Sequence, residues 1–267
     1  MATRPLPNRP AFTRTLVVLS TVVIGTTAAA CGSSPSAGRA AVPAATLLLQ
    51  AESALARVPV VKIEGSIVQK DGSATDSVSV DAISGTTTGT SEGTLDLEGP
   101  GLGFMGATRY VVVGSSTWVT GTTAFWKSYF GAQTPIVTRL EAKVFPELVG
   151  HWIELLQEST EMMYKDALGL SEPRVFVTGT LAGVKGTLTN SGTQTVNGER
   201  GVELRASTGS KIIVAGTGAP LPIELADTAS TSGSFSLDLA VTYPAGVKIA
   251  APADFASLET ILTSNAG

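Results

Sequence analysis

One pattern limits the fold of this chain more than any other feature: short segments in which apolar and polar residues alternate. In VVKIEGSI, Ile63 and Ile67 alternate with Lys62, Glu64 and Ser66. The same alternation returns in DSVSVDAIS, GTLDLEG, GVELRAS, PIELAD, SFSLDLAV and GVKIA. Because successive side chains of a strand point to opposite faces, each segment is predicted to be a strand with one apolar and one polar face.

Turn signals separate many of these segments. They are Asp71-Gly72, Gly114-Ser115, Asn190-Ser191-Gly192 and Asn197-Gly198. Such short turns join antiparallel strands, whereas parallel strands need long crossover connections. We therefore expect a large antiparallel sheet with one face in water and the other packed on helices or around a cavity.

Helical spacing of apolar residues appears in three other places. The first is TLLLQAESALARVP, where Thr46 is the predicted cap and Pro59 ends the helix. The second runs from Thr134 to Leu170 and is expected to form two helices separated near Pro146, and the third is DFASLETILT. Their apolar stripes are Leu47, Leu48, Ala51, Leu55 and Val58; Leu148, Trp152, Leu155, Leu156 and Met163; and Phe255, Leu258, Ile261 and Leu262.

The order helix, strands, helices, strands, helix predicts a single α+β domain. SSTWVTG and TAFWKSYF look like two more strands, with Trp118 and Trp126 expected as core or strand-edge aromatics. A glycine-rich stretch, EGPGLGFMGATRY, carries Leu102, Phe104 and Met105. It is interpreted as a mobile lip over a cavity mouth, as an element that dips into the membrane, or as an arc whose apolar side chains enter the core.

The N-terminus has the layout of an export signal. Arg4, Arg9 and Arg14 precede the uncharged run TLVVLSTVVIGTTAAA, and the only cysteine, Cys31, follows it. This layout predicts a signal peptide over residues 1–30. The next residues, GSSPSAGRAAVPAA, predict a flexible tether over 31–44, which leaves 45–267 as one domain.

The segment Ala28-Ala29-Ala30-Cys31 resembles the lipobox of bacterial lipoproteins. The resemblance implies a diacylglyceryl thioether on Cys31, cleavage just before it, and a location at the outer face of the cytoplasmic membrane. An ordinary secretory signal cut at the same site is the alternative, and it would leave a free N-terminal thiol. The chain has one cysteine and one histidine, His151, which are too few for a disulfide or a structural zinc site.

The mature chain also resembles the LppX/LprG lipoproteins of mycobacteria and their relatives, which share the fold of the LolA and LolB carriers. The resemblance lies in ALARVPVVKIEGSI, TVNGERGVELRAS, PLPIELAD and GSFSLDLAVTYPAGVKIAAPAD. It implies a strongly curved antiparallel half-barrel with helices on its concave face. Such a domain encloses an apolar cavity for the acyl chains of a lipid, lipoglycan or lipoprotein.

Inward-pointing apolar residues of the first strands and the central helix are the candidates for the wall of such a cavity, and ordinary core packing is the alternative. The candidates are Ile63, Ile67, Val78, Val80, Leu95, Leu97, Val112, Trp152, Leu156, Met162 and Met163. Leu102, Phe104 and Met105 are the corresponding candidates for the mouth.

Charge and motifs argue against other classes of function. Removal of residues 1–30 takes three arginines and no acidic residue, so the net charge goes from −4 to −7, which is unsuited to nucleic acid. His151 has no triad context, and Glu154 and Glu158 fit an exposed helix face. We expect no enzyme, cofactor or metal. Two classes remain: a membrane-anchored carrier of acylated ligands, and an envelope sensor or protein-interaction module.

Overall fold

The computed structural model describes residues 35–71, 73–102, 105–131, 142–155, 168–227 and 235–265. Its strands are β1 (Lys62–Asp71), β2 (Ala74–Ser84), β3 (Thr90–Glu98), β4 (Gly106–Val113), β5 (Ser116–Gly121), β6 (Ile153–Glu154), β7 (Leu188–Val196), β8 (Glu199–Ala206), β9 (Ser210–Ala215), β10 (Pro222–Asp227), β11 (Phe235–Thr242) and β12 (Ala256–Ser257). Its helices are α1 (Pro35–Ala40), α2 (Ala44–Leu55), α3 (Thr123–Tyr129), α5 (Phe145–Leu148), α7 (Pro173–Ala182), α8 (Leu258–Ser264) and the 3₁₀ turn η1 (Leu168–Ser171).

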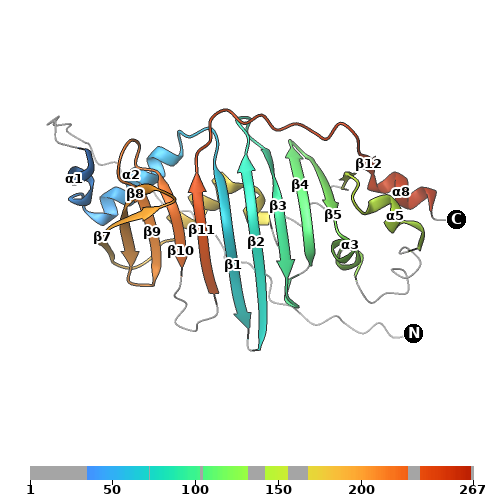
Figure 1. Cartoon of the computed structure of the whole chain (residues 1–267), viewed down its shortest axis with the longest axis horizontal. Coiled ribbons are helices and arrows are strands. Elements are labelled where there is room, and N and C mark those ends of the chain that lie inside the picture. The colour runs from blue at the N-terminus through green and yellow to red at the C-terminus, as the bar shows by residue number, and fades with distance from the viewer. Residues whose placement is uncertain are drawn as a thin grey trace.

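All 12 strands form one open, curved sheet in the order β12-β6-β5-β4-β3-β2-β1-β11-β10-β9-β8-β7 (Figure 1). Every neighbouring pair is antiparallel except β12 and β6. Consecutive strands are neighbours within β1–β5 and within β7–β11, and β11 returns to pair with β1. The predicted antiparallel sheet is therefore confirmed, and the two strand sets are joined in its middle.

The alternating segments account for most of this sheet. Six of the seven form β1, β2, β3, β8, β10 and β11, and SSTWVTG forms β5. The prediction for GVKIA is wrong, because residues 243–255 cross the sheet without joining a ladder. Val247 and Ile249 of this crossing segment pack on Val111 and Trp118, so the segment lies over a face of the sheet and not at its edge.

Register makes one face of the sheet predominantly apolar. Direct cross-strand partners connect ten strands in one row: Asn190, Leu204, Ile212, Leu225, Leu239, Gly65, Val80, Leu95, Thr108 and Gly121. A second row contains Val241, Ile63, Ala82, Gly93, Tyr110, Val119 and Ile153. A third contains Leu237, Ile67, Val78, Leu97 and Gly106. We call the face that carries these rows the inner face.

Helices cover the inner face in separate places. Buried residues of α2, α3 and α7 belong to the same apolar cluster as the three rows. α7 touches β1 and β2, α3 touches β4 and β5, and α2 touches β7. In Figure 1, α7 is drawn in yellow behind β11 and β1. The core of the domain is thus a layer between one face of the sheet and several short helices.

The first predicted helix corresponds to α2, but α2 begins earlier than predicted. It begins at Ala44 after Pro43, and Thr46 lies exposed inside it, so the predicted cap is wrong. Leu47, Leu48 and the rest of the predicted stripe as far as Leu55 are buried. Residues 35–44, the second part of the segment expected to be a flexible tether, form α1 and the start of α2 instead.

The segment TAFWKSYF is a helix, α3, and the strand prediction for it is wrong. Aromatic residues favour strands, but Thr122 accepts a hydrogen bond from the backbone N–H of Phe125 (3.2 Å) and caps a helix start. Phe125, Trp126, Tyr129 and Phe130 also recur at helical spacing. That spacing was the signal that the strand prediction overlooked.

The central helical prediction holds only in part. Phe145–Leu148 is the short helix α5, with Pro146 inside its first turn, but Ile153 and Glu154 form β6 where a second helix was expected. β6 lies between β5 and β12, and this pairing overrides the helical periodicity. Residues 132–141 and 156–167 lie outside the described residues. The helix α7 was not predicted at all.

The C-terminal prediction is right for the helix and wrong for its first residue. Leu258 and Ile261 of α8 are buried, whereas Phe255 precedes the helix and is exposed. None of the helices in the described ranges has the length and apolar character that crossing a bilayer requires.

Gly65 is required for the sheet to form as it does. It lies in the middle of β1 with a φ of +149°, and a Cβ atom there would stand 2.1 Å from the backbone oxygen of Asp238 in β11. Any side chain would push apart the two strands that join the halves of the sheet. An inward-facing residue without Cβ is also a point at which a strand can bend.

We predict that Gly65→Ala lowers the free energy of unfolding by about 3 kcal/mol or more, from backbone strain and overpacking together. The matched control is Gly114→Ala, because Gly114 also has a positive φ (+63°) but open space around its Cβ position. Gly114→Ala should lower the free energy of unfolding by only about 1 kcal/mol. Urea unfolding of the mature chain measures the free energy of unfolding of both variants. Equal losses of stability would contradict the close approach of β11 to Gly65.

Candidate functional site

The inner face carries the largest cluster of buried apolar residues in the described structure. Six of the predicted cavity residues belong to its main cluster and are buried: Ile63, Val78, Val80, Leu95, Leu97 and Val112. Ile67 is half-buried and packs against the same cluster. Sequence alternation thus predicted the side to which these residues point, and the register brings them together across β1, β2, β3 and β4.

Trp152 does not belong to this surface, and its assignment to the inner face is wrong. It packs with Val111, Trp118 and Ile249 in a smaller cluster under the crossing segment 243–255. Its ring also lies 5.6 Å from the guanidinium carbon of Arg109. The error follows from the helical prediction for residues around β6. Leu156, Met162 and Met163 lie outside the described residues.

An aromatic group at one end of the inner face was not predicted as part of a site. Phe125 and Trp126 of α3 meet edge to face with centroids 5.1 Å apart, and Trp126 meets Tyr129 in the same way at 5.5 Å. Phe130 stacks on Phe145 of α5 at 6.1 Å. These contacts form a wall of rings between α3 and α5.

Close packing on a glycine holds this aromatic wall against the sheet. A Cβ on Gly121 would stand 2.4 Å from Cδ1 of Phe125, so the ring of Phe125 rests directly on the backbone of β5. Trp126, beside it, is fully buried, with 0% of its surface exposed. Its indole Nε1 has no hydrogen-bond partner. Buried N–H donors are nearly always satisfied; within the described residues, this one and that of Trp118 under the crossing segment are not.

The glycine-rich loop before β4 is attached at both ends. The backbone N–H of Gly101 donates to Oδ1 of the buried Asp76 (2.8 Å), and the N–H of Met105 donates to Ser128 of α3 (2.8 Å). Leu102 packs against the main cluster, whereas Met105 is 41% exposed. Phe104 lies outside the described residues. Leu102 thus fits the interpretation as an arc that enters the core, and the lip over a cavity mouth stays a prediction.

The opposite, outer face carries polar rows. Glu64, Asp81, Thr94, Arg109 and Thr120 are direct partners across β1 to β5 and line a shallow hollow of about 660 Å³. Val80 and Leu95 also border this hollow. The hollow lies on the solvent side of the sheet.

Lys62 holds two carboxylates of the outer face together. Its Nζ lies 3.0 Å from Asp81 and 3.2 Å from Glu64. The hydrogen bond to Asp81, aided by the one to Glu64, raises the pKa of Lys62. The stability that this ion pair adds is present below the ordinary lysine pKa and is lost as the pH rises through the raised value.

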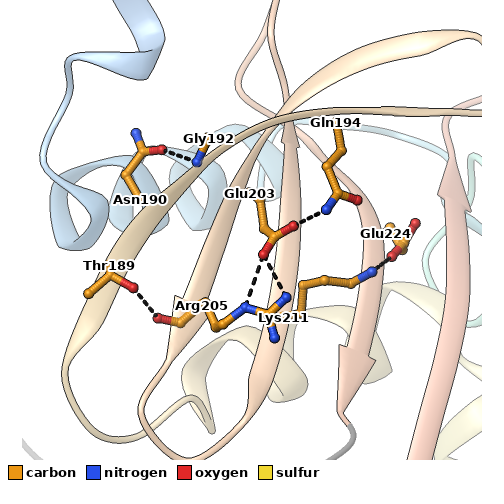
Figure 2. A network of polar contacts seen from close by, with 8 residues as sticks. All are labelled: Thr189, Asn190, Gly192, Gln194, Glu203, Arg205, Lys211 and Glu224. Carbon is orange, nitrogen blue, oxygen red and sulfur yellow. Dashed lines mark hydrogen bonds and ion pairs between the residues drawn. The ribbon is translucent and has the colours of Figure 1, made fainter.

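Polar side chains also join strands in pairs at one end of the sheet, β7 with β8 and β9 with β10 (Figure 2). Glu203 is only 3% exposed, and it accepts hydrogen bonds from Gln194 and from Nε (3.0 Å) and a terminal nitrogen (2.8 Å) of Arg205. Lys211 pairs with Glu224 beside it. A buried carboxylate needs such partners, so the contacts of Glu203 favour the observed pairing of β7 with β8.

These two faces differ in the chemistry that they can perform. The outer face carries carboxylates, hydroxyls and the cations of Lys62, Arg109, Arg205 and Lys211, and the inner face carries buried apolar side chains. Within the described residues, the indole N–H of Trp126 beside this inner face has no hydrogen-bond partner. Within the described ranges, no three His, Cys, Asp or Glu side chains come together as a metal site would require. The inner face is the candidate functional site, because it suits a long apolar ligand with one hydrogen-bond acceptor.

No protein-family model and no curated protein sequence matches the chain. Solved structures that are similar include LprF from Mycobacterium bovis, with 12% identity, a TM-score of 0.48, and coverage of 79% of this chain and 97% of that chain. The lipoprotein LppX from Mycobacterium tuberculosis has 14% identity, a TM-score of 0.42, and coverage of 77% and 99%.

A third similar structure is a LolA superfamily protein from Nitrosomonas europaea, with 13% identity, a TM-score of 0.29, and coverage of 76% and 92%. These proteins belong to the families that the sequence resembles. The similarity is one of fold.

We predict that Trp126→Phe changes the free energy of unfolding of the lipid-free mature chain by less than about 1 kcal/mol. The variant keeps a ring but removes a buried donor whose desolvation nothing offsets. Trp126→Ala leaves a cavity where the indole ring was, and it should lower the free energy of unfolding by about 3 to 5 kcal/mol. Urea unfolding compares the two variants, and a loss for Trp126→Phe close to that for Trp126→Ala would mean that the indole N–H is satisfied in the folded state.

Proposed function

We propose that this protein is an extracytoplasmic lipoprotein, anchored through Cys31 at the outer face of the cytoplasmic membrane. Its domain binds the acyl chains of a lipid, lipoglycan or lipoprotein against the inner face and carries them through the cell envelope. Helices α2, α3 and α7 lie on the concave side and cover the bound chains. The protein acts by binding alone, without catalysis.

The predominantly apolar register of the inner face is the observation that supports this proposal. Neighbouring strands are about 4.8 Å apart, so the row from Leu204 to Gly121 extends over roughly 40 Å. An acyl chain spans half of the bilayer's hydrocarbon core, or about 15 Å. The inner face is therefore long enough for more than one chain, and each buried CH₂ group contributes about 0.8 kcal/mol.

Trp126 supplies this apolar surface with a hydrogen-bond donor. The indole N–H lies within the aromatic wall of α3 and α5, and it can donate to the ester or amide carbonyl that joins an acyl chain to its head group. Carbonyl acceptors occur at that position in most acylated molecules. The site would thus recognise the junction of an acyl chain with its head group, independently of which head group follows.

The outer face supports a second candidate function. Its hollow of about 660 Å³ presents Asp96 and Arg109 to solvent beside the paired Glu64 and Asp81. A shaped surface with charged side chains around it suits a protein partner. In this alternative, the domain is an envelope sensor or interaction module, and the inner face is only its core.

Lipid mass spectrometry of the chain purified from its native host without detergent tests the carrier function. We expect an acylated molecule in stoichiometric amount. The variant Leu97→Trp fills the inner face and should lower the bound amount severalfold, whereas Thr94→Trp, on the outer face of the same strand, should leave it unchanged. Leu97→Phe is a milder version that keeps the test valid if the Trp variant is unstable.

A folded protein that is consistently empty would contradict the carrier function. Equal loss of ligand in Leu97→Trp and Thr94→Trp would place the ligand elsewhere. Capture of a partner that depends on Asp96 and Arg109, from an empty domain, would favour the interaction module.

A further inference from the structure

The N-terminal helix α1 is fastened to one end of the sheet. The guanidinium of Arg39 donates hydrogen bonds to three backbone carbonyls at the end of β9 and in the turn after it: Ala215, Thr217 (3.3 Å) and Gly218 (2.8 Å). The side-chain amide of Asn190, in β7, donates to the carbonyl of Ala40 (2.7 Å). We call these contacts the α1 clamp.

The clamp attaches to a part of the domain that is itself firmly held. Asn190 comes from the edge strand of the sheet, and Arg39 reaches the hairpin between β9 and β10. Gln194 and Glu203 join this edge strand to β8, and Lys211 pairs with Glu224 across β9 and β10 (Figure 2). A guanidinium suits such a role because its rigid fork of donors can satisfy several carbonyls at once.

The clamp lies very close to the predicted anchor. Only four residue steps separate Cys31 from Pro35, the first residue of α1. Even fully extended, this distance is at most about 14 Å. If Cys31 is acylated, the end of the sheet that carries α1 and β7 is therefore held next to the bilayer and cannot swing away from it.

The surface beside the clamp is suited to a lipid interface. No charged residue occurs from Ala40 to Ala51, and Glu52, the first one, is partly buried, which raises its pKa. Leu49 points outward from α2 and is 64% exposed, more than any other large apolar side chain in the described residues. α2 also contacts β7, so this surface belongs to the clamped end.

We propose that the α1 clamp fixes the orientation of the domain on the membrane, with the exposed side of α2 around Leu49 lying in the bilayer interface. An uncharged helix surface with an outward leucine, next to an acyl anchor, supplies the second attachment that a single anchor lacks. The other end of the sheet, with α5 and α8, then points away from the membrane (Figure 1). This inference rests on the anchor at Cys31 that the proposed function contains.

Depth-dependent quenching on vesicles tests the orientation. The full acylated chain is reconstituted into phosphatidylcholine and phosphatidylglycerol vesicles, and an NBD probe is attached at Leu49→Cys or at Val149→Cys. Acylation occupies the thiol of Cys31, so the introduced cysteine is the only free one. Val149 follows α5 at the far end of the sheet and is 36% exposed, which makes it the matched control.

We expect doxyl-labelled lipids to quench the probe at position 49 severalfold more than the probe at position 149. Adding Arg39→Ala and Asn190→Ala releases the clamp, and quenching at position 49 should then fall towards that at 149 while the protein still floats with the vesicles. Arg57→Ala, which removes an exposed arginine outside the clamp, should leave the quenching unchanged.

The outcomes separate this inference from the proposed anchor. Protein that does not float with vesicles would overturn the anchor and the orientation together. Protein that floats but is quenched equally at positions 49 and 149 would overturn the orientation alone. Strong quenching at 49 that survives loss of the clamp would overturn the role of Arg39 and Asn190. A blue-shifted probe at 49 without lipid quenching would assign this surface to a second copy or a protein partner and overturn the membrane contact.

Discussion

The structure depends on the register that joins the two halves of the sheet through β1 and β11. Because Gly65 pairs directly with Leu239, the apolar rows of the two halves become one surface across ten strands. A slip of one residue at this junction would turn the apolar set of one half towards water. Once the register is set, the inner face must be covered, and the described helices do so in separate short pieces.

The same register explains why the two faces have different chemistry. Side chains of β1 to β5 alternate strictly, so the polar row of Glu64, Asp81 and Arg109 lies directly behind the apolar row of Ile63 and Ala82. The outer face is held by local ion pairs such as that of Lys62, and among the described residues the crossing segment covers it at Trp118. The inner face holds the main apolar cluster and the unsatisfied indole of Trp126.

The alternation of apolar and polar residues allowed most of the sheet to be predicted, because the apolar residues of each strand lie on its buried face. The sequence also identified the inward residues from Ile63 to Val112. It could not show that β11 pairs with β1, because that contact is not local. Secondary structure was predicted wrongly in two places. Ile153 and Glu154 form a strand because they pair with β5, despite their helical spacing, and the residues after Thr122 form a helix because Thr122 caps it, despite their β propensity.

The parts of the site that sequence analysis missed are those that depend on packing between distant segments. The aromatic wall requires α3 to rest on Gly121, and the α1 clamp requires Arg39 to reach carbonyls of Thr217 and Gly218. Neither contact leaves a periodic signal. Composition alone had indicated a flexible tether, because Gly, Ser and Ala are frequent there, but one arginine with three carbonyl partners is enough to fix α1.

The central claim is that acyl chains lie on the inner face, and tryptophan quenching by a lipid with brominated acyl chains tests it most directly. Two single-tryptophan proteins are compared: Trp118→Phe/Trp152→Phe keeps Trp126 on the inner side, and Trp126→Phe/Trp152→Phe keeps Trp118 in the outer cluster. The account predicts saturable quenching of Trp126 and none of Trp118. No quenching of Trp126 at saturating lipid, or equal quenching of both, would contradict it.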